Sequence, residues 1–383
     1  MKKIIALLLV CAMTLACLML SSCKLLDGEN IEIAMITDGG NVDDSSLNQA
    51  VWESVANFAI AKNKSCDAYH PATQTHEDRV DCIMKAVVNG AKVVVCSGRA
   101  LEEAVFEVED LFPDVRFILV DGEPRGVVQT SGLWAPVDTT DESVVTTAGK
   151  ETPQVKISSN VYCITFREEQ AGYLAGFVAV RSGYTKLGFV SAEDSVSDML
   201  YGCGFLQGIQ DAAREMGILD RITVKFRYSG ANTTDEILLN VAENWYIAGT
   251  EVIFASGTTC SSVIEAAELT NGRVICTDSD HSPASNLVVT SAMKFVYTPI
   301  TNALNSLYDN EMKWDENHAG RSVRLGVVED GVGLPTESSS WRLGGFTVEA
   351  YEAVVARIVG GEIKVSDGDE ILREHEMIVE FTS

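Results

Sequence analysis

Acidic side chains and glycines cluster in one short segment, and their types are suited to holding a hydroxylated solute. Asp38 and Gly39 directly follow the apolar run 33–36. A carboxylate accepts hydrogen bonds from hydroxyls, and glycine lets the backbone approach a ligand closely. Asp43 and Asp44 are either further acceptors or a cap and solvated side chains at the start of a predicted helix, where the helix dipole favours negative charge. We predict that Asp38 and Gly39 contact a small polar ligand.

Other chemistries lack the residues that they need. The segment has neither the P-loop nor the GxGxxG pattern, which argues against phosphate or dinucleotide binding. The five histidines are scattered, and no Gly-x-Ser-x-Gly or His-Glu-x-x-His pattern is present. Asp38, Asp43 and Asp44 could in principle hold Ca²⁺ and cleave a ribosyl bond, but they match no complete ligand set. We expect no enzyme activity, no cofactor and no metal site.

The first 23 residues have the layout of a secretory signal. Lys2 and Lys3 precede the apolar run 4–20, and Leu20-Ser21-Ser22-Cys23 resembles the bacterial lipobox, in which the cysteine is acylated after cleavage. Cys17 is a weaker alternative, and a plain signal peptide or an uncleaved anchor are others. We predict a signal peptide at 1–22, lipidation of Cys23, a tether at 23–30, and a lipid-anchored, extracytoplasmic protein on the cell membrane or outer membrane.

The net charge and the placement of the cysteines argue against several kinds of partner and ligand. A formal charge of −26 argues against nucleic acid and anionic membranes, because counterion release needs clusters of Lys and Arg. Seven cysteines follow Cys23, mostly in apolar runs and without CxxC or CxxH spacing, so zinc is not expected. An odd number leaves at least one free thiol, and Cys66 with Cys82 is the only pair that we would test for a disulfide.

Short β-branched runs alternate with amphipathic stretches along the rest of the chain. This alternation predicts doubly wound parallel sheets with sites at the carboxyl ends of strands. About 360 residues after the leader exceed the size of a single core, so two lobes are expected. The predicted strands are 31–36, 92–96, 116–120, 161–164, 186–190, 222–228, 252–255, 274–277, 287–290 and 323–327. The predicted helices are 47–62, 76–89, 102–111, 169–181, 198–216, 234–247, 260–269 and 347–359.

The segment 122–159 is rich in Thr, Ser, Gly and Pro and has no helical period. It is too long for an ordinary connection, which indicates a flap over the site or a mobile insert. Its one large aromatic residue, Trp134, could cover a ligand or pack on the neighbouring lobe.

The segment 37–53 resembles the opening of the basic membrane protein family, which includes the purine nucleoside receptor lipoproteins of ABC transporters. The resemblance continues through most of the mature chain, at 166–176, 249–254, 276–280 and 288–294. It implies a type I periplasmic-binding-protein fold, in which two α/β lobes close on a nucleoside-like solute and present it to an ABC permease. It also implies a monomer. The expected N-terminal lobe is 31–165 plus about 286–318, and the expected C-terminal lobe is 166–285 plus about 319–383.

The resemblance also implies roles for individual residues. Asp38, Asp278 and, less directly, Asp121 would hold ribose hydroxyls, and Lys294 would bind the ligand. Asn48 would meet a purine edge, since an amide donates and accepts at once. The turn Gly257-Thr258 would let the backbone approach the sugar. Two structural alternatives stay open: Lys294 could pair with Asp278 or Asp280, and Asn48 could cap a local turn.

Departures from the family pattern concern the base pocket. The family stacks the base between two phenylalanines, but the first position is Leu47 here and the second falls on Ala231 or Asn232. A family acid appears as Gln170, and a Gly-Gly-Thr-Gly turn is reduced to Ser-Gly-Thr-Thr. The sugar side of the site would persist while the base side has changed. Four residues could supply a replacement ring, namely Trp134, Tyr201, Tyr228 and Phe254. The alternative is a surface lipoprotein that binds a protein partner or an unrelated solute.

Overall fold

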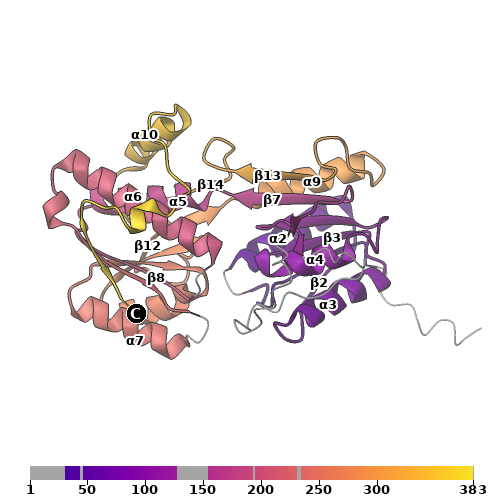
Figure 1. Ribbon diagram of the computed structural model, residues 1–383, viewed down its shortest axis with the longest axis horizontal. Coiled ribbons are helices and arrows are strands. Elements are labelled where there is room, and N and C mark those ends of the chain that lie inside the picture. Colours follow the sequence, from indigo (N-terminus) through magenta and orange to yellow (C-terminus); the bar gives the residue numbers. More distant parts are fainter. Residues whose placement is uncertain (1–30, 44–45, 127–153, 193–194, 231–233, 383) are drawn as a thin grey trace, which may run out of the picture.

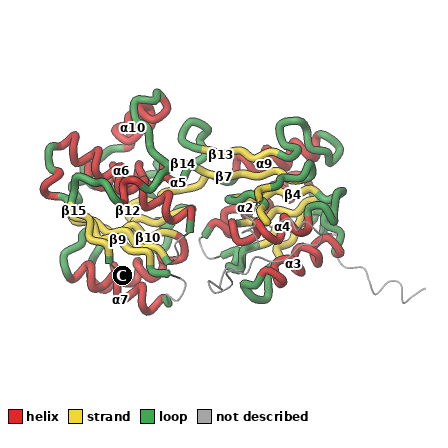
Figure 2. Tube along the Cα trace, viewed as in Figure 1, coloured by secondary structure: helices red, strands yellow, loops and turns green. Residues whose placement is uncertain are grey.

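The computed structural model describes residues 31–43, 46–126, 154–192, 195–230 and 234–382, which form two lobes side by side (Figure 1). The predictions made for Cys23, Asp44, Trp134 and Asn232 lie outside the described residues. In both lobes the helices lie outside the strands (Figure 2). This layering confirms the predicted α/β class, because a parallel sheet needs helices on both faces to bury its apolar strands.

The N-terminal lobe is built on a six-stranded parallel sheet with the order β13-β7-β4-β3-β1-β2. Alternate residues of β1 face opposite sides: Ile33 and Met35 pack towards α2 and α9, whereas Ala34 and Ile36 pack towards α3 and α4. The strands are β1 Ile33–Ile36, β2 Cys66–Tyr69, β3 Val93–Ser97, β4 Arg116–Val120, β7 Val161–Phe166 and β13 Arg321–Leu325. The helices are α2 Leu47–Lys62, α3 His76–Val88, α4 Glu102–Val108 and α9 Tyr297–Asp309. A short hairpin pairs β5 Arg125–Gly126 with β6 Gln154–Val155.

The C-terminal lobe contains a seven-stranded sheet with the order β14-β12-β11-β10-β8-β9-β15, in which only β14 is antiparallel to its neighbour. Helices α5 and α6 pack on one face, while α7 and α8 pack on the other. The strands are β8 Lys186–Ser191, β9 Thr223–Tyr228, β10 Val252–Ser256, β11 Arg273–Asp278, β12 Val288–Lys294, β14 Val332–Gly333 and β15 Ile378–Phe381. The helices are α5 Glu168–Arg181, α6 Val196–Met216, α7 Asp235–Ile247, α8 Cys260–Thr270 and α10 Val348–Val359.

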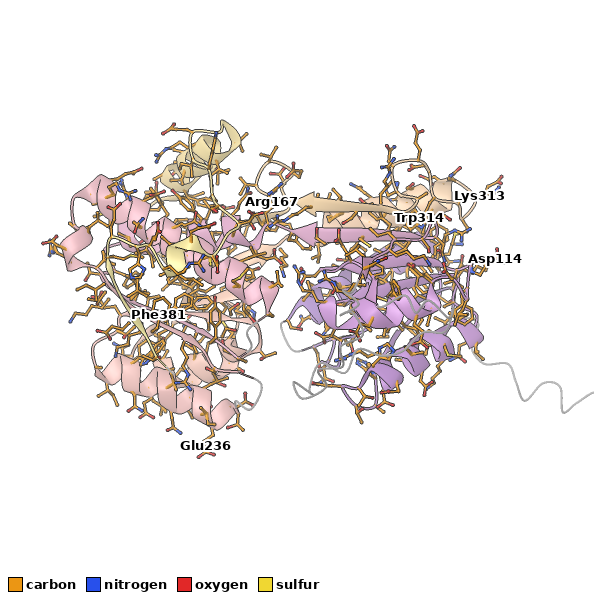
Figure 3. All side chains as sticks on the ribbon, in the orientation of Figure 1. Asp114, Arg167, Glu236, Lys313, Trp314 and Phe381 are labelled. Atoms are coloured by element: carbon orange, nitrogen blue, oxygen red, sulfur yellow. A yellow bond between two sulfur atoms is a disulfide. The ribbon has the colours of Figure 1, made fainter. Side chains whose placement is uncertain are left out.

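Three segments cross between the lobes. They link β7 to α5, β12 to α9, and β13 to β14. Arg167 forms the first crossing and lies at the junction of the lobes (Figure 3). Its backbone N–H donates to the carbonyl of Leu325, the last residue of β13. The first and third crossings are therefore joined by a hydrogen bond.

Two of the expected lobe boundaries need correction. The strand β12 pairs with β11 in the C-terminal sheet, so the chain returns to the N-terminal lobe after Lys294 and not near 286. The strand β13 pairs with β7 in the N-terminal sheet, so the last crossing follows Leu325 and not 318. The alternating pattern locates strands but carries no information about which sheet a strand joins.

Cys66 and Cys82, the pair singled out for a disulfide test, are both free. Cys66 packs on the face of the sheet that carries α2, and Cys82 on the face that carries α3, so the sheet separates them. The disulfide joins Cys260 and Cys276, whose Cα atoms are 5.6 Å apart. Both lie in the core between β10, β11 and α8. This distance is within the range that a disulfide requires.

The free thiols are expected to differ sharply in reactivity. Burial raises the pKa of Cys82 to about 11 and that of Cys203 to about 12, while Cys96 is completely buried. Only Cys66 is partly exposed among the five free cysteines of the described chain. In the native protein at neutral pH, iodoacetamide should modify Cys66 first, with about one equivalent taken up quickly. Peptide mapping checks this, and rapid native labelling of Cys96 would contradict it; denatured protein is the control.

Helices α5 and α6 pack more closely than side chains would allow. Added Cβ atoms at Gly204 and Gly208 would lie 2.0 Å from the backbone oxygens of Glu169 and Tyr173. Gly172 and Gly176 approach the backbone of α6 in the same way, at 2.2 Å. The two Gly-x-x-x-Gly pairs thus bring the helix backbones into direct contact.

Candidate functional site

Asp38 is held in place at the carboxyl end of β1. Its Oδ1 accepts hydrogen bonds from Asn48 Nδ2 at 2.8 Å and from the Gly40 N–H at 3.1 Å. Arg79 donates to the Asp38 carbonyl from Nε and Nη2, both at 3.2 Å. Gly39 has a φ of 134°, a conformation that L side chains rarely adopt. The sequence-predicted neighbours Asp38, Gly39 and Asn48 therefore meet at one edge of the sheet.

Asn48 offers an acceptor that the protein does not use. The helix α2 is capped by Ser46, whose Oγ accepts from the Asn48 N–H at 3.2 Å. The Asn48 side chain is almost buried, and its Oδ1 has no hydrogen-bond partner among the described residues. Leu47 is half-buried and packs against the apolar core. Asn48 thus braces Asp38 through its amide nitrogen, while its amide oxygen has no partner among the described residues.

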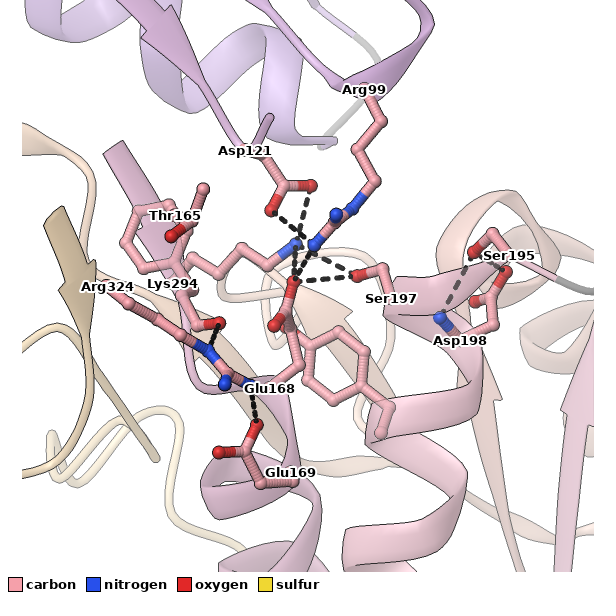
Figure 4. A network of polar contacts seen from close by, with 12 residues as sticks. Arg99, Asp121, Thr165, Glu168, Glu169, Ser195, Ser197, Asp198, Lys294 and Arg324 are labelled. Atoms are coloured by element: carbon pink, nitrogen blue, oxygen red, sulfur yellow. Dashed lines mark hydrogen bonds and ion pairs between the residues drawn. The ribbon is translucent and has the colours of Figure 1, made fainter. Parts of the chain in front are cut away.

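Lys294 lies at the centre of a polar network that crosses the lobe interface (Figure 4). Its Nζ lies 3.0 Å from Asp121 Oδ2, 3.1 Å from Asp278 Oδ1 and 3.4 Å from Glu168 Oε1. The lysine side chain is 2% exposed. Asp121 belongs to the N-terminal lobe and the other residues to the C-terminal lobe, so the ion pairs hold the lobes together. The pairing of Lys294 with Asp278, left open by the sequence, is present.

Arg99 is the second cation of this network. It follows β3, and its Nη2 lies 3.3 Å from Glu168 Oε1 and 3.9 Å from Asp121 Oδ1. Ser197, at the start of α6, donates to Glu168 Oε1 at 3.1 Å and accepts from Lys294 Nζ at 3.2 Å. Sequence reasoning missed Arg99, Glu168 and Ser197. The acid pair at 168–169 on a predicted strand-to-helix junction was the one available signal.

Three carboxyl groups and two cations share this buried space, and the pKa values of Asp121 and Glu168 shift in opposite directions. Burial raises the pKa of Asp121, and the attraction of Lys294 only partly offsets this rise. Burial also opposes ionisation of Glu168, but Lys294 and Arg99 outweigh it and lower the pKa. Burial disfavours the charged Lys294, yet Asp121, Asp278 and Glu168 raise its pKa. The lysine therefore stays charged, and Asp121 takes up a proton more readily than Glu168 does.

Asp121 and Asp278 share an unusual backbone. Asp121 directly follows β4 and Asp278 is the last residue of β11, and both have a positive φ, 65° and 69° respectively. Such left-handed conformations in residues other than glycine are uncommon and concentrate at functional sites. Tyr201 donates from its hydroxyl to Asp278 Oδ1 at 3.2 Å and to the Ala292 carbonyl at 3.4 Å. Both aspartates thus reach Lys294 from opposite lobes; Figure 4 shows Asp121 in this network.

The aromatic residues considered as replacement rings occupy other places. Tyr201 is 1% exposed, and Phe254 is completely buried among Phe189, Phe205 and Tyr201. Neither offers a face to a ligand. Tyr228 is half-buried and lies edge-on to Phe226.

The predicted Gly257-Thr258 turn is exposed at the carboxyl end of β10. Gly257 has a φ of 63°, and its N–H donates to Thr277 Oγ1 at 2.9 Å. Beside it lies Asp198, a buried carboxylate that sequence reasoning missed. Asp198 accepts hydrogen bonds from Ser256 Oγ at 2.6 Å and Ser195 Oγ at 2.7 Å. The turn is thus supported by a polar cluster at the edge of the sheet.

Asp198 leads to a pH prediction. Burial raises its pKa, and hydrogen bonds from Ser256, Ser195 and Ser191 only partly lower it. A raised carboxyl pKa means that the folded state binds the proton more tightly, so this group's contribution to stability falls as pH rises from its unfolded pKa through its folded pKa. We expect wild type to lose stability relative to Asp198→Asn as the pH rises from about 4 to about 7. Urea unfolding at both pH values checks this; an unchanged difference would contradict it.

Gln170 makes a different contact from the predicted one. Its Oε1 accepts from the Val327 N–H at 2.8 Å, in the segment that crosses from β13 to β14. The acid that faces Lys294 is Glu168, two positions earlier in the same turn of α5. Gln170 therefore braces a crossing segment in this structure.

A cavity of about 430 Å³ lies between the lobes beside Arg99. Its arginines are already paired: Arg99 with Glu168, Arg125 with Glu102, and Arg324 with Glu169. The lining is completed by side chains of both lobes: Glu123, Thr165, Phe166, Val196, Met199, Leu200, Ser322 and Asp367. Since every arginine has a carboxylate partner, the cavity has no surplus positive charge with which to hold an anion.

Two α/β lobes, three crossing segments and polar side chains converging from both lobes define a solute-binding protein. Residues 31–367 match the family described as ABC transporter substrate-binding protein PnrA-like. The chain belongs to this family, as its resemblance to the basic membrane proteins led us to expect.

Similar proteins include a basic membrane protein, a T-cell-stimulating antigen and a nucleoside-binding protein. The chain is 24% identical to basic membrane protein B of Borreliella burgdorferi, covering 94% of this chain and 95% of that protein. It is 24% identical to a CD4+ T-cell-stimulating antigen of Listeria monocytogenes, covering 88% and 89%. It is 21% identical to the ABC transporter nucleoside-binding protein BmpA of Lactococcus lactis, covering 88% and 89%.

Solved structures agree on the fold. A solute-binding protein of an ABC transporter system from Aeropyrum pernix aligns with a TM-score of 0.66 at 18% identity, covering 89% of this chain and 95% of that chain. One from Conexibacter woesei aligns with a TM-score of 0.65 at 17% identity, covering 88% and 99%. Among the described residues, no helix has both the length and the apolar character needed to span a bilayer.

Proposed function

We propose that this protein is a lipid-anchored, extracytoplasmic receptor that captures a nucleoside-like solute between its lobes and delivers it to an ABC permease. Asp38 and Asn48 would hold the solute from the N-terminal lobe, and Asp278 with the Gly257-Thr258 turn from the C-terminal lobe. Lys294 and Asp121 would sit at the floor of the site. The anchor at Cys23 is supported by the lipobox-like Leu20-Ser21-Ser22-Cys23.

One observation supports the proposed class of ligand: several buried acceptor atoms have no hydrogen-bond donor among the described residues. Asn48 Oδ1, Asp121 Oδ1 and Glu168 Oε2 have no hydrogen-bond partner among the described residues. A buried acceptor without a donor costs about 1–3 kcal/mol, so a ligand that brings hydroxyl or amine hydrogens gains by filling these positions. The negative charge of these carboxylates would repel an anionic ligand. The site thus favours a neutral, donor-rich solute such as a nucleoside over a nucleotide.

The base side of the proposed site differs from that of a stacking receptor. Leu47 stands in the first stacking position, and Tyr201 and Phe254 are buried in the core. Aromatic stacking contributes about 1–3 kcal/mol per base in nucleic-acid binders. We therefore propose a base pocket with weaker purine preference, in which the sugar hydroxyls supply a larger share of the affinity.

The test is native mass spectrometry of gently purified protein, followed by thermal-shift titration. The panel contains purine and pyrimidine nucleosides, free bases, pentoses and nucleoside monophosphates. We expect a nucleoside to stabilise the protein at micromolar concentration and its monophosphate to do so far less. A folded protein that is empty and silent across the panel would overturn the proposal, and preferential stabilisation by monophosphates would overturn the inferred ligand class.

Asp278→Asn supplies the residue-level prediction. Asparagine tolerates the left-handed backbone at this position, but it removes the charge that accepts a ligand hydroxyl. Hydrogen bonds to charged groups contribute about 1.5–3 kcal/mol, so nucleoside affinity should fall by about 10-fold to 100-fold. Asp220→Ala, an exposed acid just before β9 at the opposite edge of the sheet, is the matched control. Equal affinity in both variants would remove Asp278 from the site.

A further inference from the structure

Two cysteines and a histidine meet in the C-terminal lobe, and none of them is a member of the interlobe network. The Sγ atoms of Cys260 and Cys276 and a ring nitrogen of His281 all lie within 4.8 Å of one another. Cys260 begins α8, Cys276 lies on β11, and His281 follows the end of that strand. The cluster could not be predicted from the sequence, because its three residues come from separate elements and do not show the CxxC or CxxH spacing of common zinc sites.

The surroundings hold the three side chains in position. Cys260 is 3% exposed, Cys276 is completely buried and His281 is 9% exposed. The backbone N–H of His281 donates to Ser291 Oγ at 3.1 Å. Arg342 donates to the carbonyls of Ser282, Ser285 and Val288, which secures the loop that follows the histidine. The imidazole is thus presented from a fixed loop at the edge of the core.

The same donor set suits a thiophilic divalent cation. Tetrahedral zinc binds thiolates at about 2.3 Å and imidazole at about 2.0 Å, so two bound sulfurs lie about 3.8 Å apart. The separation of 5.6 Å between the two Cα atoms leaves the sulfurs within reach of such a geometry. Two thiolates and a neutral imidazole around a divalent ion carry no net charge. A neutral complex is compatible with the apolar core that surrounds the cysteines.

We propose that Cys260, Cys276 and His281 form a second, redox-gated site, which binds a zinc-class divalent cation when the disulfide is reduced. In the oxidised state the sulfurs are bonded to each other, and the site is closed. A small dithiol donates two electrons, breaking the sulfur–sulfur bond to give two thiols and becoming a disulfide itself. Metal binding then forms two metal–sulfur bonds and one metal–nitrogen bond and releases two protons to solvent.

Either state connects two walls of the proposed solute site. Cys260 directly follows the turn Gly257–Thr259, and Cys276 precedes Asp278 on β11. A disulfide or a bound ion therefore fixes the turn against the strand that carries Asp278. The metal site can nevertheless be tested by metal binding alone, without any assumption about the solute.

The experiment uses the full-length protein, oxidised or reduced with a small dithiol that is then removed without air. Co²⁺ serves as the optical probe and Zn²⁺ as the competitor. We expect the reduced protein to bind about one Co²⁺ per chain with a thiolate-to-cobalt absorption band, and Zn²⁺ to displace it. The oxidised protein should show no such band. The absence of the band in reduced protein, or equal uptake in both states, would overturn the proposal.

Variants separate this site from the other thiols. His281→Ala should weaken Co²⁺ binding by at least the roughly 10-fold that loss of an outer-shell partner causes, and Cys276→Ala should abolish the band. Cys66→Ala, which removes the partly exposed thiol outside the cluster, should bind as wild type does. Circular dichroism confirms folding, and His281→Gln replaces the alanine variant if that fails to fold. An unchanged band in the His281 and Cys276 variants would assign the cobalt to other cysteines.

Discussion

Replacing Gly204 with alanine is expected to lower the free energy of unfolding by about 3 kcal/mol or more, which is large for one methyl group. The new Cβ would lie 2.0 Å from the carbonyl oxygen of Glu169, which is backbone and cannot rotate away. Helices α5 and α6 would have to separate along their whole contact. Urea unfolding followed by circular dichroism measures the change.

Gly344→Ala is the control for the Gly204 experiment. Gly344 lies in a turn with no heavy atom within 4 Å of its added Cβ and no positive φ. Its replacement should change stability by less than about 0.5 kcal/mol. If Gly204→Ala were as mild as Gly344→Ala, the close helix contact would not exist in solution.

The second large effect is expected for Lys294→Met. Methionine fills a similar volume but leaves Asp121, Glu168 and Asp278 without their shared cation. Breaking a buried ion pair by removing one partner typically costs about 3–5 kcal/mol. The loss should be greatest near neutral pH. Lys294 lowers the pKa of Asp121 and Glu168, so without it these two pKa values rise, and the folded variant regains stability as pH falls and the two carboxyls take up protons.

Lys64→Met is the surface control for this prediction. Lys64 pairs with Glu32 at 3.1 Å, but its side chain is 30% exposed. Such pairs contribute at most about 1 kcal/mol. Adding Asp121→Asn to Lys294→Met should recover part of the lost stability, because one uncompensated charge is removed. A Lys294 variant as stable as the Lys64 variant at pH 7, with no pH dependence, would disprove the buried network.

Much of the fold was predictable because each lobe repeats one simple pattern. The apolar run at 92–96 predicted a buried parallel strand, and β3 spans Val93–Ser97. The predicted helix 198–216 corresponds to α6, Val196–Met216, because its apolar residues recur at helical spacing. Asp38 with Asn48 was also within reach of the sequence, since the carboxyl end of a strand and the next helix are close in chain and in space.

The interlobe network was less accessible to sequence reasoning, for a physical reason. Arg99 and Glu168 are 69 residues apart, and they meet only because a crossing segment folds one lobe against the other. The hydrophobic periodicity of a sequence gives no information about such a long-range contact. The same limitation explains the disulfide: Cys66 and Cys82 are close in sequence but separated by a sheet, while Cys260 and Cys276 lie on neighbouring elements of one core.

The glycine contact between α5 and α6 also has a mechanical consequence. Helix α5 starts with Glu168 directly after a crossing, and α6 starts beside Ser197. Because their backbones touch, these two helices must turn together as one stiff lever. Bending during lobe motion is then concentrated in Arg167, residues 295–296 and residues 326–331. Small rotations in those few residues would then move α5 and α6 as one unit, without bending either helix.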